Sequence, residues 1–345
     1  MLGIQLMSAL SDPYREFDNK SVLVTGGTGS FGKRFIKNLL ARSNVRRVVV
    51  YSRDEFKQYE MQQQFSEHLS TLRFFIGDVR DGQRLQLAAR ETDIIVHSAA
   101  LKHVPAAEYN PFECIRTNII GAENVVHAAL NNGLEKVLAL STDKAANPIN
   151  LYGATKLASD KIFVAANNLS GSIGTRFSVV RYGNVVGSRG SVIPFFRGLI
   201  ANGADHMPIT DVRMTRFWIT LQQGVDFVTS SIAMMRGGEI FVPKIPSMRM
   251  TDLAACLAPK LPIREIGIRP GEKLHEVMVT DDDSRQTLEL PDRYIIEPAF
   301  NFWKRETYLE SGARSVTEGF RYASDTNDEW LDGERLKRLM AETIE

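Results

Sequence analysis

The sequence predicts an α/β protein, in which a doubly wound parallel sheet is followed by a smaller C-terminal α/β domain. Short apolar runs alternate with helical patterns from Ser21 to Tyr182, and this alternation requires parallel strands joined by helices. A glycine-rich turn, Gly26 to Gly32, joins the first strand to the first helix, as in Rossmann sheets that bind dinucleotides. The alternation stops after Tyr182, where the second domain is expected to begin.

The composition is that of an ordinary globular chain. Its 345 residues are 43% hydrophobic and 24% charged, and a formal net charge of +1 gives no support for a nucleic-acid partner. Cys114 and Cys256 lie far apart and match no metal-ligand spacing, so we expect no metal and a reduced, cytoplasmic setting. No apolar run is long enough for a membrane span, and residues 1–18 are expected to be a leader rather than a signal peptide.

The first strand and its turn predict a phosphate-binding site. Ser21–Thr25 is apolar and β-branched, and glycines follow at 26, 29 and 32. Such a turn lets backbone N–H groups at a helix N-terminus approach a pyrophosphate. The cofactor contacts expected here are Gly26, Thr28, Gly29, Ser30, Phe31 and Gly32.

The end of the second strand, Arg47–Tyr51, indicates which dinucleotide is bound. Ser52 and Arg53 follow it, and a Ser-Arg pair can hold the 2′-phosphate of NADP. Asp54 stands late for the ribose contact of an NAD site, but we include it among the cofactor contacts. Lys57, on a helix expected over residues 55–69, either faces the same pocket or is a solvated surface lysine.

The third and fourth strands complete the expected cofactor cleft. After Leu72–Ile76, Asp78 and Val79 are expected against the adenine, unless Asp78 caps the helix that begins near Gly82. Small residues after Ile94–His97 suit the close approach of a cofactor. The contacts expected there are Ser98, Ala99, Ala100 and Lys102, of which Lys102 can reach a phosphate or the substrate.

The fifth strand ends in residues that can do chemistry. Val137–Leu140 is an apolar run typical of a buried strand. Thr142, Asp143 and Lys144 follow it and place a hydroxyl, a carboxyl and an amine at the edge where open α/β sheets bind ligands.

The helix expected over residues 152–168 carries a tyrosine and a lysine on one face. Tyr152 and Lys156 are four residues apart, and the ammonium favours the phenolate. The pKa of the phenol is therefore expected to be lowered, which makes Tyr152 a candidate base for an alcohol hydroxyl. Asn118, inside a helix expected over residues 111–132, either holds backbone behind this site or lies on the surface.

The second half of the chain is less regular. After the strand Phe177–Tyr182 we expect a glycine-rich loop at 183–194, helices over 221–235 and 251–257, a strand at 239–242, a turn into a helix at 269–276 and an irregular stretch at 281–330. The expected domains are the NADP-binding domain at 19–182 with about 222–258, the substrate domain at 183–221 and 259–330, and a C-terminal helix at 331–345.

Four segments resemble a known family: Thr25–Gly32, Tyr51–Glu55, Ala99–Pro105 and Ser141–Ala145. They are similar to extended short-chain dehydrogenase/reductases and, within these, to the inverting UDP-N-acetylglucosamine 4,6-dehydratases, which begin pseudaminic acid synthesis for bacterial flagellin or surface-glycan modification. Thr-Asp-Lys is the most specific part of the resemblance, because dTDP-glucose and GDP-mannose dehydratases carry Thr-Asp-Glu. Tyr152 favours the soluble inverting branch, since membrane-anchored retaining relatives tend to have Met there.

The resemblance implies a lyase that uses tightly bound NADP and UDP-N-acetylglucosamine. Tyr152, activated by Lys156, would take the C4 hydroxyl proton while hydride leaves C4. Lys144 would remove the C5 proton and Asp143 would protonate the leaving C6 hydroxyl, with Thr142 beside them. The two roles can be exchanged, because the adjacent charges can share one proton.

The resemblance also implies the remaining contacts. Those to the UDP-sugar are Lys102, Asn184, Arg189, Gly190, Ser191, Val192, Ile193, Arg216, Arg269 and Glu272, and those added to the cofactor are Tyr152, Lys156 and Val185. The family suggests a homo-oligomer, a dimer or a hexamer. The alternatives are a retaining dehydratase, a UDP-sugar 4-epimerase, which needs neither Asp143 nor Lys144, and an NADP-sensing regulator, which can lose the Tyr-Lys pair.

Overall fold

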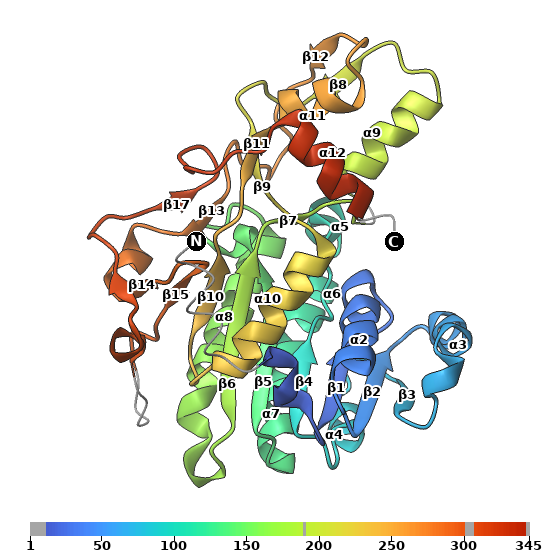
Figure 1. The fold of residues 1–345 in the computed structure, drawn as a ribbon, viewed down its shortest axis with the longest axis vertical. Helices are drawn as coiled ribbons and strands as arrows, with labels where there is room; N and C mark the ends of the chain where they lie inside the picture. Colours follow the sequence, from blue (N-terminus) through green and yellow to red (C-terminus); the bar gives the residue numbers. More distant parts are fainter. Residues whose placement is uncertain (1–11, 189–190, 301–306, 343–345) are drawn as a thin grey trace.

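A ten-stranded sheet forms the centre of the molecule (Figure 1). The computed structural model describes residues 12–188, 191–300 and 307–342. The strands of the sheet are β1 (Ser21–Thr25), β2 (Arg47–Ser52), β3 (Leu72–Ile76), β4 (Ile94–His97), β5 (Lys136–Thr142), β6 (Arg176–Tyr182), β10 (Ile240–Pro243), β14 (Thr287–Glu289), β15 (Arg293–Ile296) and β16 (Arg314–Ser315). Their order is β16-β14-β15-β10-β6-β5-β4-β1-β2-β3. The predicted fold class is confirmed.

The sheet is parallel from β10 to β3, and β15, β14 and β16 extend it in antiparallel fashion. β1 lies between β2 and β4, so the strand order reverses there. In open α/β sheets such a reversal opens a ligand crevice at the carboxyl ends of the strands. The residues predicted to carry chemistry follow β1, β4 and β5, and therefore meet at this edge.

Helices cover both faces of the sheet. They are α2 (Ser30–Arg42), α3 (Glu55–Gln64), α4 (Gly82–Ala88), α7 (Gly121–Asn132), α8 (Leu151–Leu169) and α10 (Leu221–Met234). Two short helices, α5 (Val104–Tyr109) and α6 (Pro111–Ile115), pack beside α8 instead of on the sheet. Buried side chains of α4, α7 and α8 pack on one face, and those of α2 and α10 pack on the other (Figure 1).

A smaller lobe stands over the carboxyl ends of the strands. It contains β7 (Asn184–Val185), α9 (Val192–Ala201), β8 (Met207–Ile209), β9 (Thr215–Ile219), β11 (Ser247–Arg249), α11 (Met250–Leu257), β12 (Ile263–Glu265) and α12 (Gly333–Glu342). Its own apolar core includes Phe196, Trp218, Leu253 and Leu336. A further pair of strands, β13 (Val277–Val279) and β17 (Tyr322–Ala323), lies between this lobe and the sheet (Figure 1).

The structure corrects the expected domain limits in three places. Residues 12–18 belong to the fold, because Tyr14 and Phe17 of a 3₁₀ turn are buried against α2 and α10. α11 was expected in the nucleotide-binding domain, but its apolar face fills the core of the smaller lobe. β14 to β16 were expected in the substrate domain, but they lengthen the large sheet. In each case the element packs against, or pairs with, elements that are distant in the sequence, so no local sequence pattern indicates where it belongs.

Candidate active site

The turn between β1 and α2 forms a cradle that requires glycine. Gly26 has a φ of +66°, and a Cβ there would lie 3.0 Å from the backbone nitrogen of Ala99. A Cβ on Gly32 would lie 2.5 Å from the carbonyl oxygen of Gly27, so this glycine lets α2 pack on the turn. The N-cap is Gly29, which has no side chain to occupy the first N–H groups of the helix. These N–H groups suit a phosphate, so the turn fits a dinucleotide.

The end of β2 is joined to this turn. Thr28 Oγ1 and Ser52 Oγ lie 2.7 Å apart. Arg53 Nη1 lies 3.5 Å from Asp78 Oδ2, and the arginine side chain is 55% exposed. The guanidinium is thus paired with a carboxylate on the neighbouring strand end and remains half exposed, where it could also contact an anion.

Asp54 and Lys57 contact each other at the start of α3. Asp54 caps α3 by accepting a hydrogen bond from the backbone of Lys57 at 3.0 Å, and its other oxygen lies 2.8 Å from Lys57 Nζ. The alternative reading of Asp78 as a helix cap is wrong, because Asp81 caps α4 by accepting from Arg84 N.

The residues after β4 are fixed by Thr25 at the end of β1. Its Oγ1 lies 2.8 Å from His97 Nδ1 and accepts a hydrogen bond from Ala99 N at 3.3 Å. Ser98 Oγ donates to the carbonyl of Thr25 at 2.7 Å. The backbone of the expected cofactor contacts is thereby held at the switch point of the sheet. The other expected contacts begin or follow the neighbouring elements: Ser30 and Phe31 in the first turn of α2, Val79 after β3, and Ala100 after β4.

Asn118 holds the backbone behind the site, as one of its two readings predicted. It is buried within a π-helical turn, Arg116–Ile120, between α6 and α7. Its amide accepts from Leu101 N at 2.9 Å and donates to Leu101 O at 3.0 Å and to Thr155 Oγ1 at 3.0 Å. The asparagine therefore couples the chain after β4 to the helix that carries Tyr152.

The fully buried carboxylate of Asp143 forms an ion pair with Lys144, whose side chain is 25% exposed, at the end of β5. Thr142 Oγ1 and Lys144 Nζ each donate to Asp143 Oδ1 at 2.9 Å. Lys144 Nζ also donates to Asn184 Oδ1 at 3.3 Å and lies 3.6 Å from Glu276 Oε1. Burial works against the charged amine, but the carboxylates of Asp143 and Glu276 prevail and raise the pKa of Lys144. The amine is therefore an ammonium at rest.

Tyr152 and Lys156 both lie on α8, but the expected effect on the phenol is wrong. Burial raises the pKa of Tyr152 to about 12, against the lowering influence of Lys144 and of a hydrogen bond with Thr142. Lys156 Nζ donates to the carbonyl of Leu140 at 2.8 Å, and burial lowers its own pKa. The lysine is turned toward the end of β5, and Lys144 supplies the cationic influence that was expected from Lys156.

Glu276 is a candidate that the sequence did not reveal. The helix expected over residues 269–276 does not form, and the end of this stretch is bonded instead to β9 and to Ser324. Arg216 donates to Leu274 O at 3.0 Å and to Lys273 O at 2.8 Å. This extended stretch carries the buried Glu276 side chain to Lys144. No motif marks the glutamate, since its position depends on pairing with a distant strand.

Of the residues predicted to contact the UDP-sugar, the structure places only some beside Lys144. Asn184 bonds Lys144, and Lys102 lies near enough that burial and the charge of Lys144 together lower its pKa. Arg216 is buried, donates to the backbone carbonyls of Thr215, Lys273 and Leu274, and lies 3.8 Å from Glu272 Oε1. The other contacts lie in the loops and helix ends around the site: Val185 on β7, Ser191, Val192 and Ile193 at the start of α9, and Arg269 and Glu272 in the turn before β13. Arg189 and Gly190 lie outside the described residues.

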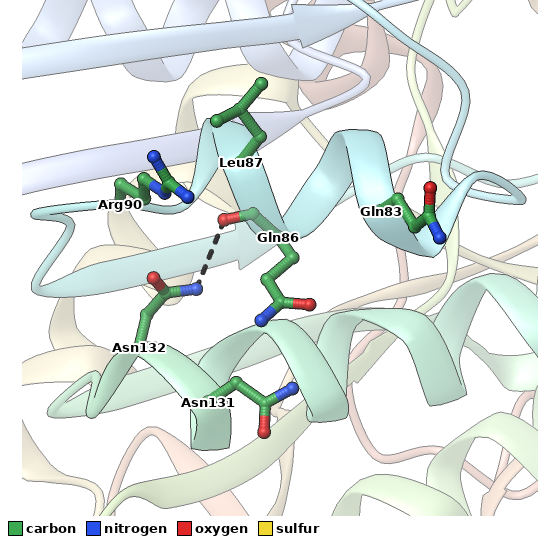
Figure 2. A pocket seen from close by; sticks show the side chains of 6 residues that line it. All are labelled: Gln83, Gln86, Leu87, Arg90, Asn131 and Asn132. Carbon is green, nitrogen blue, oxygen red and sulfur yellow. Dashed lines mark hydrogen bonds between the residues drawn. The ribbon is translucent and has the colours of Figure 1, made fainter.

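Other features of the described chain are separate from this site. A polar hollow of about 550 Å³ lies between α4 and α7, where Asn132 donates to the carbonyl of Gln86 at 3.2 Å (Figure 2). Across the described ranges, no group of three or more acidic, histidine or cysteine side chains is arranged to hold a metal ion. Within the same ranges no helix has the length and apolar character that a bilayer span requires.

A doubly wound sheet with a glycine cradle and a Tyr-Lys pair on the helix after β5 defines an extended short-chain dehydrogenase/reductase. The chain belongs to the polysaccharide biosynthesis protein family of these enzymes, whose profile matches residues 22–298. It is 55% identical over 332 residues, 95% of this chain and 99% of the relative, to the inverting UDP-N-acetylglucosamine 4,6-dehydratase of Campylobacter jejuni subsp. jejuni serotype O:23/36 (strain 81-176).

Two further comparisons extend the likeness. The UDP-glucose 4-epimerase of Rickettsia akari (strain Hartford) is 39% identical over 332 residues, 94% of this chain and 96% of the relative. The crystal structure of Pen from Bacillus thuringiensis matches with a TM-score of 0.85 at 38% identity, covering 94% of this chain and 98% of that one.

Proposed function

We propose that this protein is an inverting UDP-N-acetylglucosamine 4,6-dehydratase that uses NADP. The observation that carries the proposal is the Asp143–Lys144 ion pair, 2.9 Å long, at the end of β5. A dehydration needs both a base for the C5 proton and an acid for the C6 hydroxyl, and this pair offers both beside Tyr152. The relative at 55% identity bears the name of this activity. Following the family resemblance, the product would enter pseudaminic acid synthesis.

The residues of the glycine cradle would hold the pyrophosphate of NADP, and Ser52 with Arg53 its 2′-phosphate. The chemistry that a bound nicotinamide supplies is hydride transfer, away from C4 at the start and back to C6 at the end. Tyr152 accepts the C4 hydroxyl proton on its phenolate oxygen. Since burial raises the pKa of Tyr152 to about 12, this acceptance is favoured by rising pH.

The elimination is then a transfer of protons around the ion pair. The ammonium of Lys144 passes one proton to Asp143 across their 2.9 Å hydrogen bond. The neutral amine takes the C5 proton, which the C4 ketone has made acidic, and Asp143 gives its proton to the departing C6 hydroxyl. Water leaves and Lys144 is again an ammonium. C5 takes a solvent proton on the opposite face, and Tyr152 releases the C4 hydroxyl proton to solvent, so protons balance over the turnover.

A 4-epimerase is the second candidate, because the Rickettsia relative bears that name. Oxidation and reduction at C4 alone would leave Asp143 and Lys144 without a task. Burying the Asp143 carboxylate completely costs desolvation free energy, which only good pairing geometry offsets, so such a pair is not expected at a site that does not use it. The ion pair therefore favours the dehydratase. A cytoplasmic location and a dimeric or hexameric state remain predictions from the family resemblance.

The test is proton NMR of the purified protein with UDP-N-acetylglucosamine in D₂O, with and without added NADP⁺. We expect a 6-deoxy-4-keto sugar of L-arabino configuration that carries deuterium at C5. The D-xylo ketone as first product would assign a retaining dehydratase. UDP-N-acetylgalactosamine would assign a 4-epimerase and remove the roles given to Asp143 and Lys144.

A further inference from the structure

Glu276 is held rigidly at the point where the smaller lobe meets the sheet. It directly precedes β13, and its backbone N donates to Ser324 Oγ at 2.9 Å while its carbonyl accepts from Ser324 N at 2.8 Å. The residue is only 2% exposed. Its backbone and its burial therefore leave the carboxylate little freedom to move away from the site.

Three cations surround this carboxylate. Glu276 Oε1 lies 3.6 Å from Lys144 Nζ and 3.8 Å from Arg216 Nε, and Oε2 lies 3.8 Å from Lys273 Nζ. Two of the cations are fixed by backbone: Arg216 through carbonyl groups, and Lys273 through Ala146 O at 2.6 Å. They compensate the cost of burying the glutamate. Lys144 differs from them, because the side-chain bonds of its amine are to Asp143 and Asn184.

Lys144 thus stands between two buried carboxylates that come from opposite parts of the chain. Asp143 Oδ2 and Glu276 Oε2 are both buried, and neither has a hydrogen-bond partner among the described residues. Asp143 exchanges a proton with Lys144 in the function proposed above. Glu276 lies farther from the amine than Asp143 does, 3.6 Å against 2.9 Å, so it acts on the ammonium by its charge.

We propose that Glu276 is a positioning residue for the C5 proton transfer: its carboxylate holds the Lys144 amine beside Asp143 and stabilises the positive charge that the amine regains from C5. This inference rests on the proposed dehydratase function. Glu276 forms no bond to the sugar and loses no proton itself. The proton that Lys144 takes from C5 becomes an ammonium proton, and the glutamate is the counter-charge already in place.

The test is Glu276→Gln, which keeps the shape of the side chain and removes its charge. We expect the rate of C5 deuterium incorporation to fall by about tenfold to a hundredfold, because a misplaced amine attacks less often. C4 oxidation, followed as nicotinamide absorbance in a single turnover, and the KM for UDP-N-acetylglucosamine should change little.

The pH profile separates positioning from a structural role. The charged and titratable groups facing Lys144 are Asp143, Tyr152, Glu276, Arg216, Lys102 and Lys273. Removing one negative charge lowers the pKa of the amine. In a plot of the rate of C5 deuterium incorporation against pH, the transition that reflects the titration of Lys144 should therefore lie at lower pH in Glu276→Gln than in the wild type.

Two controls make the outcome decisive. Glu239→Gln removes another fully buried carboxylate, one that bonds Ser178 and the backbone of Gly237 outside the site, and should leave the pH profile unchanged. In a Lys144→Ala background, Glu276→Gln should have no further effect on C5 incorporation. An unchanged profile in Glu276→Gln, or a full additional loss in the Lys144→Ala background, overturns the inference. A wild-type protein that forms no 4-keto product overturns the proposed function, and this inference with it.

Discussion

Lys156 donates a hydrogen bond from Nζ to the carbonyl oxygen of Leu140, 2.8 Å away, and so ties α8 to the end of β5. The phenol of Tyr152, one helical turn earlier, is therefore governed by burial, which raises its pKa to about 12, while Lys144 and Thr142 oppose the rise. We therefore expect the two lysines to have separate tasks in the proposed function: Lys156 fixes the helix, and Lys144 places a positive charge beside the substrate.

Tyr152→Phe keeps the ring and removes the proton acceptor. We expect C4 oxidation to slow by roughly a hundredfold to ten-thousandfold, the usual contribution of a positioned acid or base. In the wild type this step should accelerate as pH rises, because the phenolate forms only toward the raised pKa of Tyr152. Single-turnover nicotinamide absorbance across a pH series measures both effects. A Phe variant that keeps the wild-type slope would show that another group takes the proton.

Arg53→Ala tests the choice of cofactor. Its guanidinium is exposed beside Ser52, where the 2′-phosphate of NADP is proposed to lie. Loss of a charge-assisted bond to phosphate should weaken NADP binding by about 1.5–3 kcal/mol and leave NAD binding nearly unchanged. Calorimetric titration with both cofactors gives the comparison. Arg285→Ala, which removes an exposed arginine paired with Glu318, is the matched control and should bind NADP as the wild type does.

Two glycine-to-alanine substitutions test the packing around the glycine turn, one at a crowded position and one at an open position. A Cβ at Gly32 would meet the backbone of Gly27 at 2.5 Å, whereas a Cβ at Gly198 within α9 meets nothing within 4 Å. Gly32→Ala should lower the melting temperature and the affinity for NADP together, because α2 must move off the turn. Gly198→Ala should stabilise the protein by about 0.5–1 kcal/mol through its higher helix propensity. Equal melting temperatures for the two variants would contradict the packing described here.

His97 predicts how stability depends on pH. It is buried beside Thr25, and burial lowers its pKa from 6.5 to about 3. In the unfolded chain the imidazole of His97 is protonated below about pH 6.5, whereas in the folded chain it stays neutral down to about pH 3. The free energy of unfolding therefore decreases as pH falls from about 6.5 to about 3. The contribution is about 2 kcal/mol between pH 7 and pH 5. Denaturant unfolding of His97→Gln at both values should show a smaller loss than the wild type by this amount.

Phe17→Ala tests whether residues 12–18 belong to the fold. The ring is fully buried and packs edge-on against Phe35 at 5.9 Å between centroids. Its loss should lower the free energy of unfolding by about 3–5 kcal/mol. Tyr109→Ala removes an aromatic side chain that is 88% exposed, and should change the free energy by less than about 0.5 kcal/mol. If both variants changed the free energy of unfolding by a similar amount, residues 12–18 would be a leader that does not contribute to the fold.

What could be predicted from the sequence was local. The strands at 21–25, 47–52 and 136–142 have apolar periodicity over a few residues, and the glycine turn has a fixed spacing, so both could be recognised without tertiary information. Asp143 and Lys144 could be singled out because they follow one of these strands directly, and Tyr152 because it precedes Lys156 by four residues.

What could not be predicted depends on distant partners. Glu276 lies in a stretch whose pattern resembles a helix start, but the residues that bond this stretch, Arg216 and Ser324, are each about fifty to sixty residues away in the chain. The predicted lowering of the Tyr152 pKa was also wrong, because this pKa depends on burial by the rest of the fold and on the direction in which Lys156 points. Sequence spacing gives neither quantity.

The path of the chain between the lobes has a consequence for how the protein folds. Along the chain, β9 belongs to the smaller lobe and β10 belongs to the large sheet. The chain then returns to the smaller lobe for α11 and β12, and to the large sheet for β14 to β16. The smaller lobe in turn takes Leu336 from the last helix of the chain. Neither lobe can thus be completed by a contiguous piece of a nascent chain on the ribosome. Because such distant pairings make folding slow, we expect slow refolding.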